Sequence, residues 1–240
     1  MLRLSVVIPV LNDAALLEPC FAALAAQSRP VYEIIVVDNG STDDSAAVAR
    51  RLGARVIEEL SPGIPAAAST GLDAATGDVL SRIDSDTVVP PDWCERVLTT
   101  FEMDASADAL SGPGEFYGAP GFVRKLGQVL YMRAYFATVA PLVGQKPVFG
   151  SNYAIRTEAW RAVRREVHLR RDVHDDMDLS FQLDGRFVIR HDPLLMVAIS
   201  ARPITSPTNL AKHFWLAGIT IWVNWRERGP VDRWKARRRV

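Results

Sequence analysis

An alternation of strand-like and helix-like segments in the N-terminal part of the chain restricts its possible folds more than any other feature. The Val- and Ile-rich segments 4–10 and 33–38 are nearly free of polar residues, as expected of strands covered on both faces. A helical pattern follows each of them, which predicts an α/β fold with a mostly parallel central sheet and helices on both faces. The predicted strands are 4–10, 33–38, 55–57 and a fourth that starts at 78, and the predicted helices are 14–27, 44–52 and 66–75.

Capping residues and glycines mark the expected ends of the helices. Asn12 and Asp13 are predicted to cap the first helix, the turn 38–43 is predicted to cap the second, and Gly77 is predicted to end the third. Further along the chain, Thr157 is the predicted N-cap of a helix that contains Trp160. The Gly- and Pro-rich stretch 112–121 is predicted to be a loop. The remaining predicted elements are helices at 122–140, 175–183 and 208–228 and strands at 153–156, 187–190 and 195–199.

The composition excludes several classes of function. The 240 residues carry 28 basic and 28 acidic side chains, so no overall positive field attracts nucleic acid, and no nucleic-acid partner is expected. Only Cys20 and Cys94 are present, too few for a disulfide framework or a zinc site made of cysteines. The N-terminus lacks the pattern of a signal peptide, and no uncharged run approaches the ~18 residues of a spanning helix. We therefore expect the catalytic part to be cytoplasmic.

Carboxylates follow two of the predicted strands. Asp38 ends the second strand, and Asp84 and Asp86 end the fourth, just before a Pro-Pro pair at 90–91 that cannot continue a central strand. Because ligands of open α/β sheets bind beyond the carboxyl ends of the strands, these acids can converge on one ligand. Two acids one residue apart offer oxygen ligands to Mg²⁺ or Mn²⁺, and such ions also bind substrate phosphates. The alternative for Asp84 and Asp86 is an ordinary polar loop after a buried strand.

Sequence blocks point to a more specific interpretation. The chain lacks both the G-x-G-x-x-G pattern of dinucleotide-binding folds and the phosphate-loop pattern G-x-x-x-x-G-K-[ST]. Instead, five blocks in order resemble family 2 glycosyltransferases with the GT-A fold, over about residues 4–202. The third block, G-D-V-L-S-R-I-D-S-D followed by P-P-D-W, is similar to the family's D-x-D block, and the fifth, D-D-M-D-L-S, to the block with the general base. The five blocks are residues 5–12, 36–43, 77–93, 149–160 and 175–180.

The resemblance implies a role for each matching residue. Asp176 corresponds to the general base, and Asp86, together with Asp84, to the site for Mg²⁺ or Mn²⁺. Trp93 is included in the sugar site because a tryptophan beside such a site can stack on a hexose face, although most tryptophans simply pack. The implied nucleotide- and donor-binding residues are Pro9, Asn12, Asp38, Ser69, Arg82, Asp84 and Ser85, and those for the donor sugar or acceptor are Trp93, Gly150, Ser151, Asn152 and Asp175.

Two stretches depart from the family pattern. Where the family often has Arg and Asn in a G-x-S-A-A-R-N-x-G segment, this chain has Ala68 and Ser69, so a polar contact to the nucleotide is absent and Arg82 is the candidate replacement. Many relatives carry a late histidine near the metal, but the corresponding stretch 197–202 contains none. The metal is then expected to bind aspartates, phosphates and water. The other candidates, for which structural roles are the alternative, are His174, His191 and His213.

The implied reaction is inverting transfer of a sugar, expected to be a hexose, from a UDP- or GDP-sugar to an acceptor hydroxyl. A metal on Asp86 neutralises the charge that develops on the leaving diphosphate. Asp176 takes the acceptor proton, and Asp175 and Asp178 are competing candidates because neighbouring acids raise each other's proton affinity. The alternative for residues 175–178 is an acidic helix N-terminus that interacts with the helix dipole.

Two other functions remain open. A phosphatase of the haloacid-dehalogenase type opens with D-x-D-x-[TV] after a strand, a pattern that residues 84–88 fit, and Asp175 and Asp176 would supply its late acidic pair. That motif normally ends the first strand, whereas two complete βα units precede it here. The other alternative is a non-catalytic protein that binds a nucleotide-sugar. Such a protein would bind a nucleoside diphosphate with metal but would transfer nothing.

We expect a catalytic domain at residues 1–205 and a C-terminal amphipathic helix with a basic tail at 206–240. Residues 1–92 form the nucleotide-binding half of the domain, and 93–205 form the acceptor half. The uncharged stretch 214–225 is rich in aromatic residues, too short to span a bilayer, and followed by a basic tail at 233–239. Such a segment is typical of contact with an anionic membrane surface, which would bring the site to a lipid-linked acceptor at the cytoplasmic face. Burial against the end of the sheet is the alternative.

Overall fold

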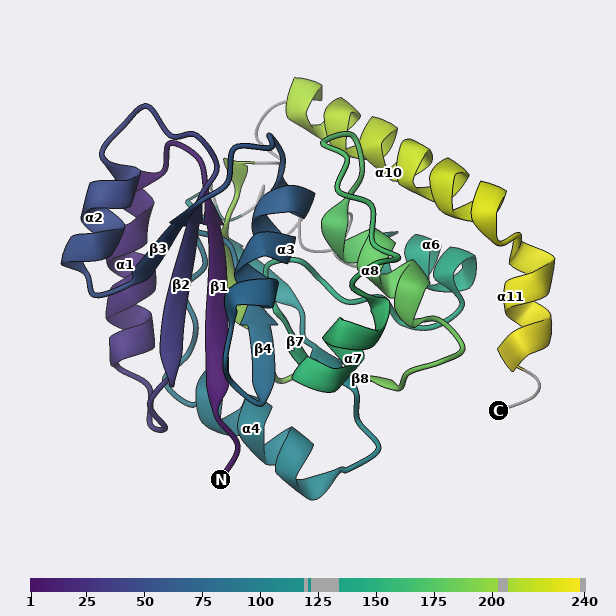
Figure 1. The fold of residues 1–240 in the computed structure, drawn as a ribbon, viewed down its shortest axis with the longest axis horizontal. Coiled ribbons are helices and arrows are strands. Elements are labelled where there is room, and N and C mark those ends of the chain that lie inside the picture. The colour runs from purple at the N-terminus through teal and green to yellow at the C-terminus, as the bar shows by residue number, and fades with distance from the viewer. Residues whose placement is uncertain (119–120, 122–133, 203–206, 238–240) are drawn as a thin grey trace.

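A mostly parallel sheet forms the centre of the computed structural model, which describes residues 1–118, 121, 134–202 and 207–237 (Figure 1). Its strands are β1 (Leu4–Val10), β2 (Glu33–Asp38), β3 (Arg55–Glu58), β4 (Val79–Arg82), β5 (Ala109–Ser111), β7 (Tyr153–Arg156) and β8 (Ile189–His191). Within the described residues these seven strands have the order β3-β2-β1-β4-β7-β5-β8. The first four in this order are parallel, β7 is antiparallel to β4 and β5, and β8 is parallel to β5. The predicted α/β sheet is therefore confirmed.

Helices cover both faces of the sheet, and successive side chains along each strand contact the two layers in turn. In β1, Val6 and Ile8 pack into the cluster on one face, whereas Val7 packs into the cluster on the other. One face carries α1 (Ala14–Ala25), α2 (Ser45–Arg51) and α4 (Trp93–Met103), and the other carries α3 (Ile64–Ala74), α7 (Thr157–Val163) and α8 (Asp175–Leu183).

A second, two-stranded sheet lies beside the loop that follows β4. It pairs β6 (Gly114–Tyr117) with β9 (Val197–Ser200) in parallel. Val88 of the loop exchanges two backbone hydrogen bonds with Ala198 of β9, at 2.8 and 2.9 Å. The prediction of a loop throughout 112–121 is wrong at β6. This short strand gains its backbone partners from β9, far along the chain, and no local pattern reveals such a pairing.

The helices α6 (Ala134–Val143), α10 (Pro207–Glu227) and α11 (Pro230–Arg237) lie on the α8 side of the molecule (Figure 1). Apolar side chains join three helices, because Ile221 and Trp225 of α10 pack against the cluster of Val143 from α6 and Phe181 from α8. The expected boundary at 205–206 lies outside the described residues, as do residues 122–133 of the predicted helix 122–140.

Asp43, in the turn predicted to cap the second helix, caps the first helix as well. Asp13 lies at the N-cap of α1, but its side chain makes no capping hydrogen bond. Asp43 instead accepts hydrogen bonds from the backbone N–H groups of Ala14 (3.2 Å) and Ser45 (2.9 Å), so one carboxylate serves α1 and α2 together. The capping prediction for Asn12 and Asp13 is therefore wrong, because the partner comes from a neighbouring loop.

The turn before β4 packs closely against β1 at the amino-terminal edge of the sheet. Helix α3 ends at Ala74, before Gly77, so the prediction that Gly77 ends this helix is wrong. A Cβ atom at Gly77 would lie 2.6 Å from Ser5 Oγ and 2.8 Å from Arg3 O, so only glycine fits there. Thr157, the predicted N-cap of α7, makes no capping bond and donates its hydroxyl proton to Gly77 O (2.7 Å).

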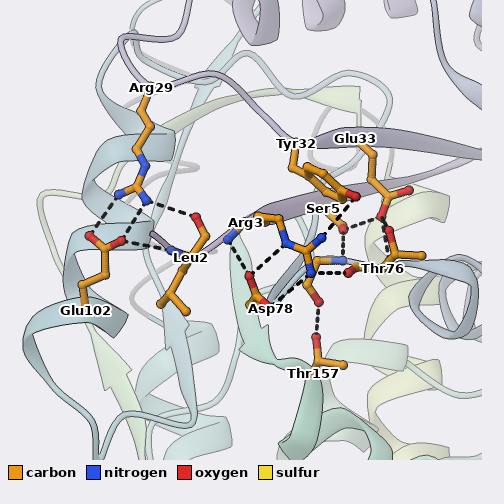
Figure 2. A network of polar contacts seen from close by, with 11 residues as sticks. Leu2, Arg3, Ser5, Arg29, Tyr32, Glu33, Thr76, Asp78, Glu102 and Thr157 are labelled. Carbon is orange, nitrogen blue, oxygen red and sulfur yellow. Dashed lines mark hydrogen bonds and ion pairs between the residues drawn. The ribbon is translucent and has the colours of Figure 1, made fainter.

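Charged pairs fix the same edge of the sheet, as Figure 2 shows. The guanidinium of Arg3 donates to the carboxylate of Asp78 (3.2 Å), which ties the start of β1 to the start of β4. Arg29 donates twice to Glu102 of α4, at 2.8 and 3.0 Å. These bonds close the end of the sheet opposite the carboxyl ends of β1, β2 and β4, where the predicted site residues gather.

Candidate functional site

The loops after β1 and β2 are joined by Asn12. This residue has a left-handed backbone conformation (φ 57°), which asparagine tolerates better than most residues. Its side-chain oxygen accepts a hydrogen bond from the backbone N–H of Thr42 (2.7 Å), and its own backbone N–H donates to Ser41 Oγ (3.0 Å). Asp38 accepts from the backbone N–H of Ser41 (3.1 Å). Pro9 lies in β1 beside the end of β2, so the predicted nucleotide-binding residues of these two strands lie together.

Arg82 connects the acids after β4 to the acids at the start of α8. Its side chain, at the end of β4, is only 4% exposed. The guanidinium donates from Nη2 to Asp84 Oδ1 (2.7 Å), and its Nε lies 3.6 Å from Asp175 Oδ2. Ser151 donates its hydroxyl proton to the other oxygen of Asp84. Four predicted site residues from distant parts of the sequence therefore meet at the end of β4.

Asp86 bonds a second arginine, Arg202, which follows β9. Arg202 Nη2 donates to Asp86 Oδ2 (2.8 Å), and Nη1 donates to Asp13 Oδ1 (2.6 Å). The second oxygen of Asp13 accepts the hydroxyl proton of Ser85 (2.6 Å). Burial and the nearby charge of Asp84 raise the pKa of Asp86 to about 6, against the opposite effect of Arg202. This carboxylate therefore lies where additional positive charge is favourable.

Sequence reasoning did not find Arg202 as a site residue. The only available signal was its position at the end of the stretch 197–202, where a metal-binding histidine was sought. The contact becomes apparent only when β9 pairs with Val88 of the loop after β4, because this pairing brings Arg202 to Asp86.

Backbone groups orient Asp176 at the start of α8. Its Oδ2 accepts a hydrogen bond from the backbone N–H of Gly150 (2.8 Å), and its Oδ1 accepts from that of Met177 (2.7 Å). A Cβ atom at Gly150 would lie 2.1 Å from Arg82 Nη1, so this position also requires glycine. The predicted residues Gly150 and Asp176 are thus in direct contact.

Asp175 lies in a different environment from its neighbour. Its Oδ2 is buried without a hydrogen-bond partner among the described residues, and Arg82 Nε lies 3.6 Å away. Burial raises the pKa of Asp175 to about 6, because the attraction of Arg82 offsets only part of the desolvation and Asp176 and Asp84 add to the rise. Ser69 is buried in α3 and lines a small cavity together with Asp175.

Two predicted sugar-site residues belong instead to the core. Trp93 is 0% exposed, and its indole N–H donates to Asn152 Oδ1 (3.0 Å). Asn152 is also 0% exposed, and its amide donates to Leu195 O (2.6 Å) and Pro113 O (3.2 Å). Because both side chains are enclosed and bonded to each other, the prediction that they contact the sugar or the acceptor is wrong. They brace α4 against the turn before β7.

Asp178, the third acid of α8, belongs to a buried polar network. Asp178 is 1% exposed and accepts hydrogen bonds from the backbone N–H of His168 (2.8 Å) and from Asn224 Nδ2 of α10 (2.7 Å). His168 Nδ1 lies 2.8 Å from Asp178 Oδ1, and this bond raises the pKa of His168 to about 9. Gln182 donates to Asn224 Oδ1 (2.9 Å). Asp178 is fully engaged in these bonds, so it is not a suitable general base.

Two of the candidate histidines contact each other, one at the N-cap of α8 and the other in α10. His174 and His213 of α10 stack with ring centroids 5.4 Å apart, and burial lowers the pKa of His213. His191 ends β8, at the far edge of the sheet. In the described part of the chain, no three His, Cys, Asp or Glu side chains are grouped to hold a metal ion.

The donor set at Asp86 nevertheless fits Mg²⁺ or Mn²⁺. These ions take oxygen ligands and commonly use one or two carboxylates, with substrate phosphates and water completing the coordination. Asp86 and Asp13 place two carboxylates around a single positive charge, so a divalent ion would be better matched to them than one guanidinium. The chain would supply Asp86 as the principal ligand.

Comparison with known proteins decides the family. The family model described as glycosyl transferase family 2 matches residues 5–170. The chain belongs to this family. Glycosyltransferase AglE of Haloferax volcanii is 34% identical over 120 residues, which cover 47% of this chain and 39% of that protein. An uncharacterised glycosyltransferase of Mycobacterium tuberculosis is 38% identical over 108 residues, covering 45% and 47%. This family 2 chain therefore spans less than half the length of these relatives in the alignments.

Solved structures establish the fold of this family 2 glycosyltransferase. Glucosyl-3-phosphoglycerate synthase from Mycobacterium tuberculosis, in complex with Mn²⁺, UDP and glucosyl-3-phosphoglycerate, has a TM-score of 0.62 at 23% identity, covering 90% of this chain and 80% of that one. A mannosyltransferase from Pyrobaculum calidifontis in complex with GDP-mannose and Mn²⁺ has a TM-score of 0.61 at 21% identity, covering 82% and 56%. The expected GT-A fold is confirmed, and the phosphatase alternative is not favoured.

Proposed function

We propose that this chain transfers a hexosyl group, with inversion, from a UDP- or GDP-sugar to an acceptor hydroxyl, with Mg²⁺ or Mn²⁺ at Asp86. The observation that carries the proposal is the meeting of two groups of acids through one buried arginine. Arg82 lies 2.7 Å from Asp84 after β4 and 3.6 Å from Asp175 at the start of α8. Acids for the diphosphate and acids for the acceptor are thus adjacent, as a direct displacement requires.

The donor would lie across the carboxyl ends of β1, β2 and β4. The proposed position of the nucleoside is beside Pro9, Asn12 and Asp38. The proposed position of the diphosphate is beside Asp86. A bound divalent ion would neutralise the charge that develops on the leaving diphosphate. Related solved structures contain Mn²⁺ with UDP or with GDP-mannose, which supports this choice of donor and metal.

Asp176 is the proposed general base. Two backbone N–H groups, of Gly150 and Met177, hold its carboxylate in one orientation, and such fixed geometry favours proton transfer. The hydroxyl that loses its proton then attacks the anomeric carbon opposite the leaving diphosphate, and the configuration inverts. Asp175 is the competing candidate, because its raised pKa of about 6 lies closer to neutral pH.

Donor and metal binding test the proposal most directly. Thermal melting with a panel of UDP- and GDP-sugars should show stabilisation that depends on Mn²⁺, of ~2.7 kcal/mol when the ligand is at 100 times its dissociation constant. Asp86→Ala should abolish both this stabilisation and transfer while the fold is kept. Asp104→Ala, which removes an acid from the opposite edge of the sheet, is the matched control and should behave as wild type. Wild-type turnover of Asp86→Ala in Mn²⁺ would refute the metal assignment, and donor binding without any transfer would support the non-catalytic alternative.

The exposed face of α10 supports a second proposal, that the protein contacts the cytoplasmic face of a membrane and uses a lipid-linked acceptor. Phe214, Trp215 and Trp222 are 69%, 59% and 54% exposed. The guanidinium of Arg226 lies 4.8 Å from the centre of the Trp222 ring. Exposed aromatic side chains beside cations are typical of segments that lie in the membrane interface. No helix in the described part of the chain is long and apolar enough to cross a membrane.

Co-sedimentation with vesicles tests this second proposal. Binding should require anionic lipid and weaken with salt. It should fall when Trp215 and Trp222 are replaced by Ser, and when the basic residues 237–239 are made neutral. Leu194→Ser, at another exposed apolar residue, between β8 and β9, is the matched control. Equal recovery in the supernatant with and without anionic vesicles at low salt would rule out the membrane contact.

A further inference from the structure

A guanidinium lies at the carboxylate where the proposed function puts a metal ion. Arg202 donates to Asp86 Oδ2 (2.8 Å) and to Asp13 Oδ1 (2.6 Å), and a further contact of 3.2 Å joins it to Asp13 Oδ2. Hydrogen bonds between an arginine and carboxylates are charge-assisted and among the strongest in proteins. Arg202 therefore links the start of α1 to the loop after β4 through two acids.

The backbone around Arg202 sets its position. Ala201, the preceding residue, donates its backbone N–H to Tyr117 O of β6 (3.0 Å). The hydroxyl of Tyr117 donates to Asp86 O (2.7 Å), so β6 is tied to the same loop as β9. Ordered strands, rather than a free loop, thus bring Arg202 to Asp86. The side chain of Arg202 is nevertheless 52% exposed, which leaves room for it to move without unfolding either strand.

A metal ion and Arg202 would use the same carboxylate. Asp86 Oδ2 accepts the hydrogen bond from Arg202, and a divalent ion bound to Asp86 would be repelled by a guanidinium held within bonding distance. Arg202 must then leave Asp86. The diphosphate of the donor, which would approach the same place, offers it another anionic partner with suitable bidentate geometry.

We infer that Arg202 competes with the divalent ion for Asp86 and passes to the donor diphosphate when the ion binds. The inference rests on the proposed function and adds a coupling to it. Metal alone binds weakly because it must displace Arg202 without compensation. Metal and nucleotide together bind well, because the displaced guanidinium gains a phosphate partner. Each ligand therefore increases the affinity of the protein for the other through this residue.

Binding of Mn²⁺ alone to the whole chain, measured by electron paramagnetic resonance of the free ion, tests the competition. Arg202→Gln should bind Mn²⁺ about tenfold more tightly than wild type, since one charge-assisted hydrogen bond no longer has to be broken. Arg202→Lys should show a smaller increase, because an ammonium cannot bridge two carboxylates as a guanidinium does. Arg190→Gln is the matched control. It removes an arginine of similar exposure that pairs with Asp104 at the opposite edge of the sheet, and its Mn²⁺ affinity should equal that of wild type.

A second measurement tests the transfer to the diphosphate. In saturating Mn²⁺, Arg202→Gln should bind UDP and GDP about tenfold more weakly than wild type, because a cation beside the diphosphate is lost. Mn²⁺ affinity that is unchanged in both Arg202 variants, with melting curves like that of wild type, would overturn the inference. The Lys variant decides the question if the Gln variant does not fold.

An error in the proposed metal site would give a different experimental result from an error in the competition. Asp86→Asn should abolish Mn²⁺ binding whatever the role of Arg202. If Asp86→Asn binds Mn²⁺ like wild type, the metal site itself is wrongly assigned. If Asp86→Asn loses the ion while the Arg202 variants bind it like wild type, only the competition is wrong.

Discussion

The acids after β4 and the proposed base of α8 are held by different chemistry. Asp84 and Asp86, after β4, each bond an arginine side chain. Asp176, at the start of α8, accepts hydrogen bonds from two backbone N–H groups. Side-chain cations can be exchanged for a metal ion, whereas backbone groups keep a carboxylate in one orientation. The first arrangement suits binding of charge, and the second suits proton transfer.

The largest expected effect comes from removing Asp178, the buried carboxylate that joins α8 to His168 and to Asn224 of α10. Asp178→Ala should lower the free energy of unfolding by about 3–5 kcal/mol, because His168 and Asn224 each lose a hydrogen bond to a buried carboxylate. Denaturation by urea would measure the loss. Asp104→Ala removes one acid of an exposed pair with Arg190 and should cost no more than about 1 kcal/mol. If the two variants are equally stable, the network does not hold α8.

The next effect concerns the base itself. Asp176→Asn keeps the shape of the side chain but removes its ability to accept a proton, so transfer should fall by ~10²-fold or more. Donor affinity, measured by calorimetry, should stay close to wild type, because the proposed donor site is at Asp84 and Asp86. Equal losses of rate and of donor affinity would indicate a structural role. Full activity of Asp176→Asn, with Asp175→Asn inactive, would move the base to Asp175.

A smaller effect is expected from a side chain at Gly150, which lies against Arg82 where this arginine contacts Asp84 and Asp175. Gly150→Ala would place a methyl group 2.1 Å from Arg82 Nη1, so Arg82 must shift away from the acids. We expect a loss of ~1–3 kcal/mol in the free energy of unfolding, as for other overpacked sites, together with weaker donor binding. Gly218→Ala in α10, where no atom would lie within 4 Å of the new methyl group, is the control and should be neutral or slightly stabilising. If Gly150→Ala has the same free energy of unfolding as wild type, Arg82 can move away from Gly150 without cost.

The smallest predicted effect is the part of the pH dependence of stability that His168 contributes. The pKa of His168 is about 9 in the folded protein against an ordinary value of 6.5, so folding favours its protonated form. Its contribution is complete below pH 6.5 and is lost as the pH rises through 9. The loss should not exceed about 2 kcal/mol, because the second partner of His168, Glu227, is exposed. Thermal melting from pH 6 to 10 would detect it, and His168→Gln should remove this part of the slope.

Much of the fold was predictable because it depends on local patterns. The strands β1, β2 and β7 and the helix α8 have the predicted bounds, since apolar runs and turn residues mark their ends. Strand β6 was missed because its pairing depends on β9. The cap of α1 was assigned to the wrong residues because Asp43, from a neighbouring loop, supplies the bond.

The site was predictable only in part. The acids at 84, 86, 175 and 176 were chosen from their blocks, and the structure brings Asp84 and Asp175 to the same arginine, Arg82. Trp93 and Asn152 were assigned to the sugar site because residue type alone does not reveal that two side chains bond to each other in the core. Arg202 and His168 were missed because their partners lie far away in the sequence. Pairings of charged residues across the fold leave no local signal.

The bond between Asn224 and Asp178 also bears on how the molecule opens. Detaching α10 from α8 would leave a buried carboxylate without one of its donors, so the two helices should separate only at considerable cost. Their backbone amides are then expected to exchange with deuterium as one cooperative unit rather than helix by helix. Helix α10, although distant from α8 in the sequence, would thus share the local stability of the helix that carries the proposed base.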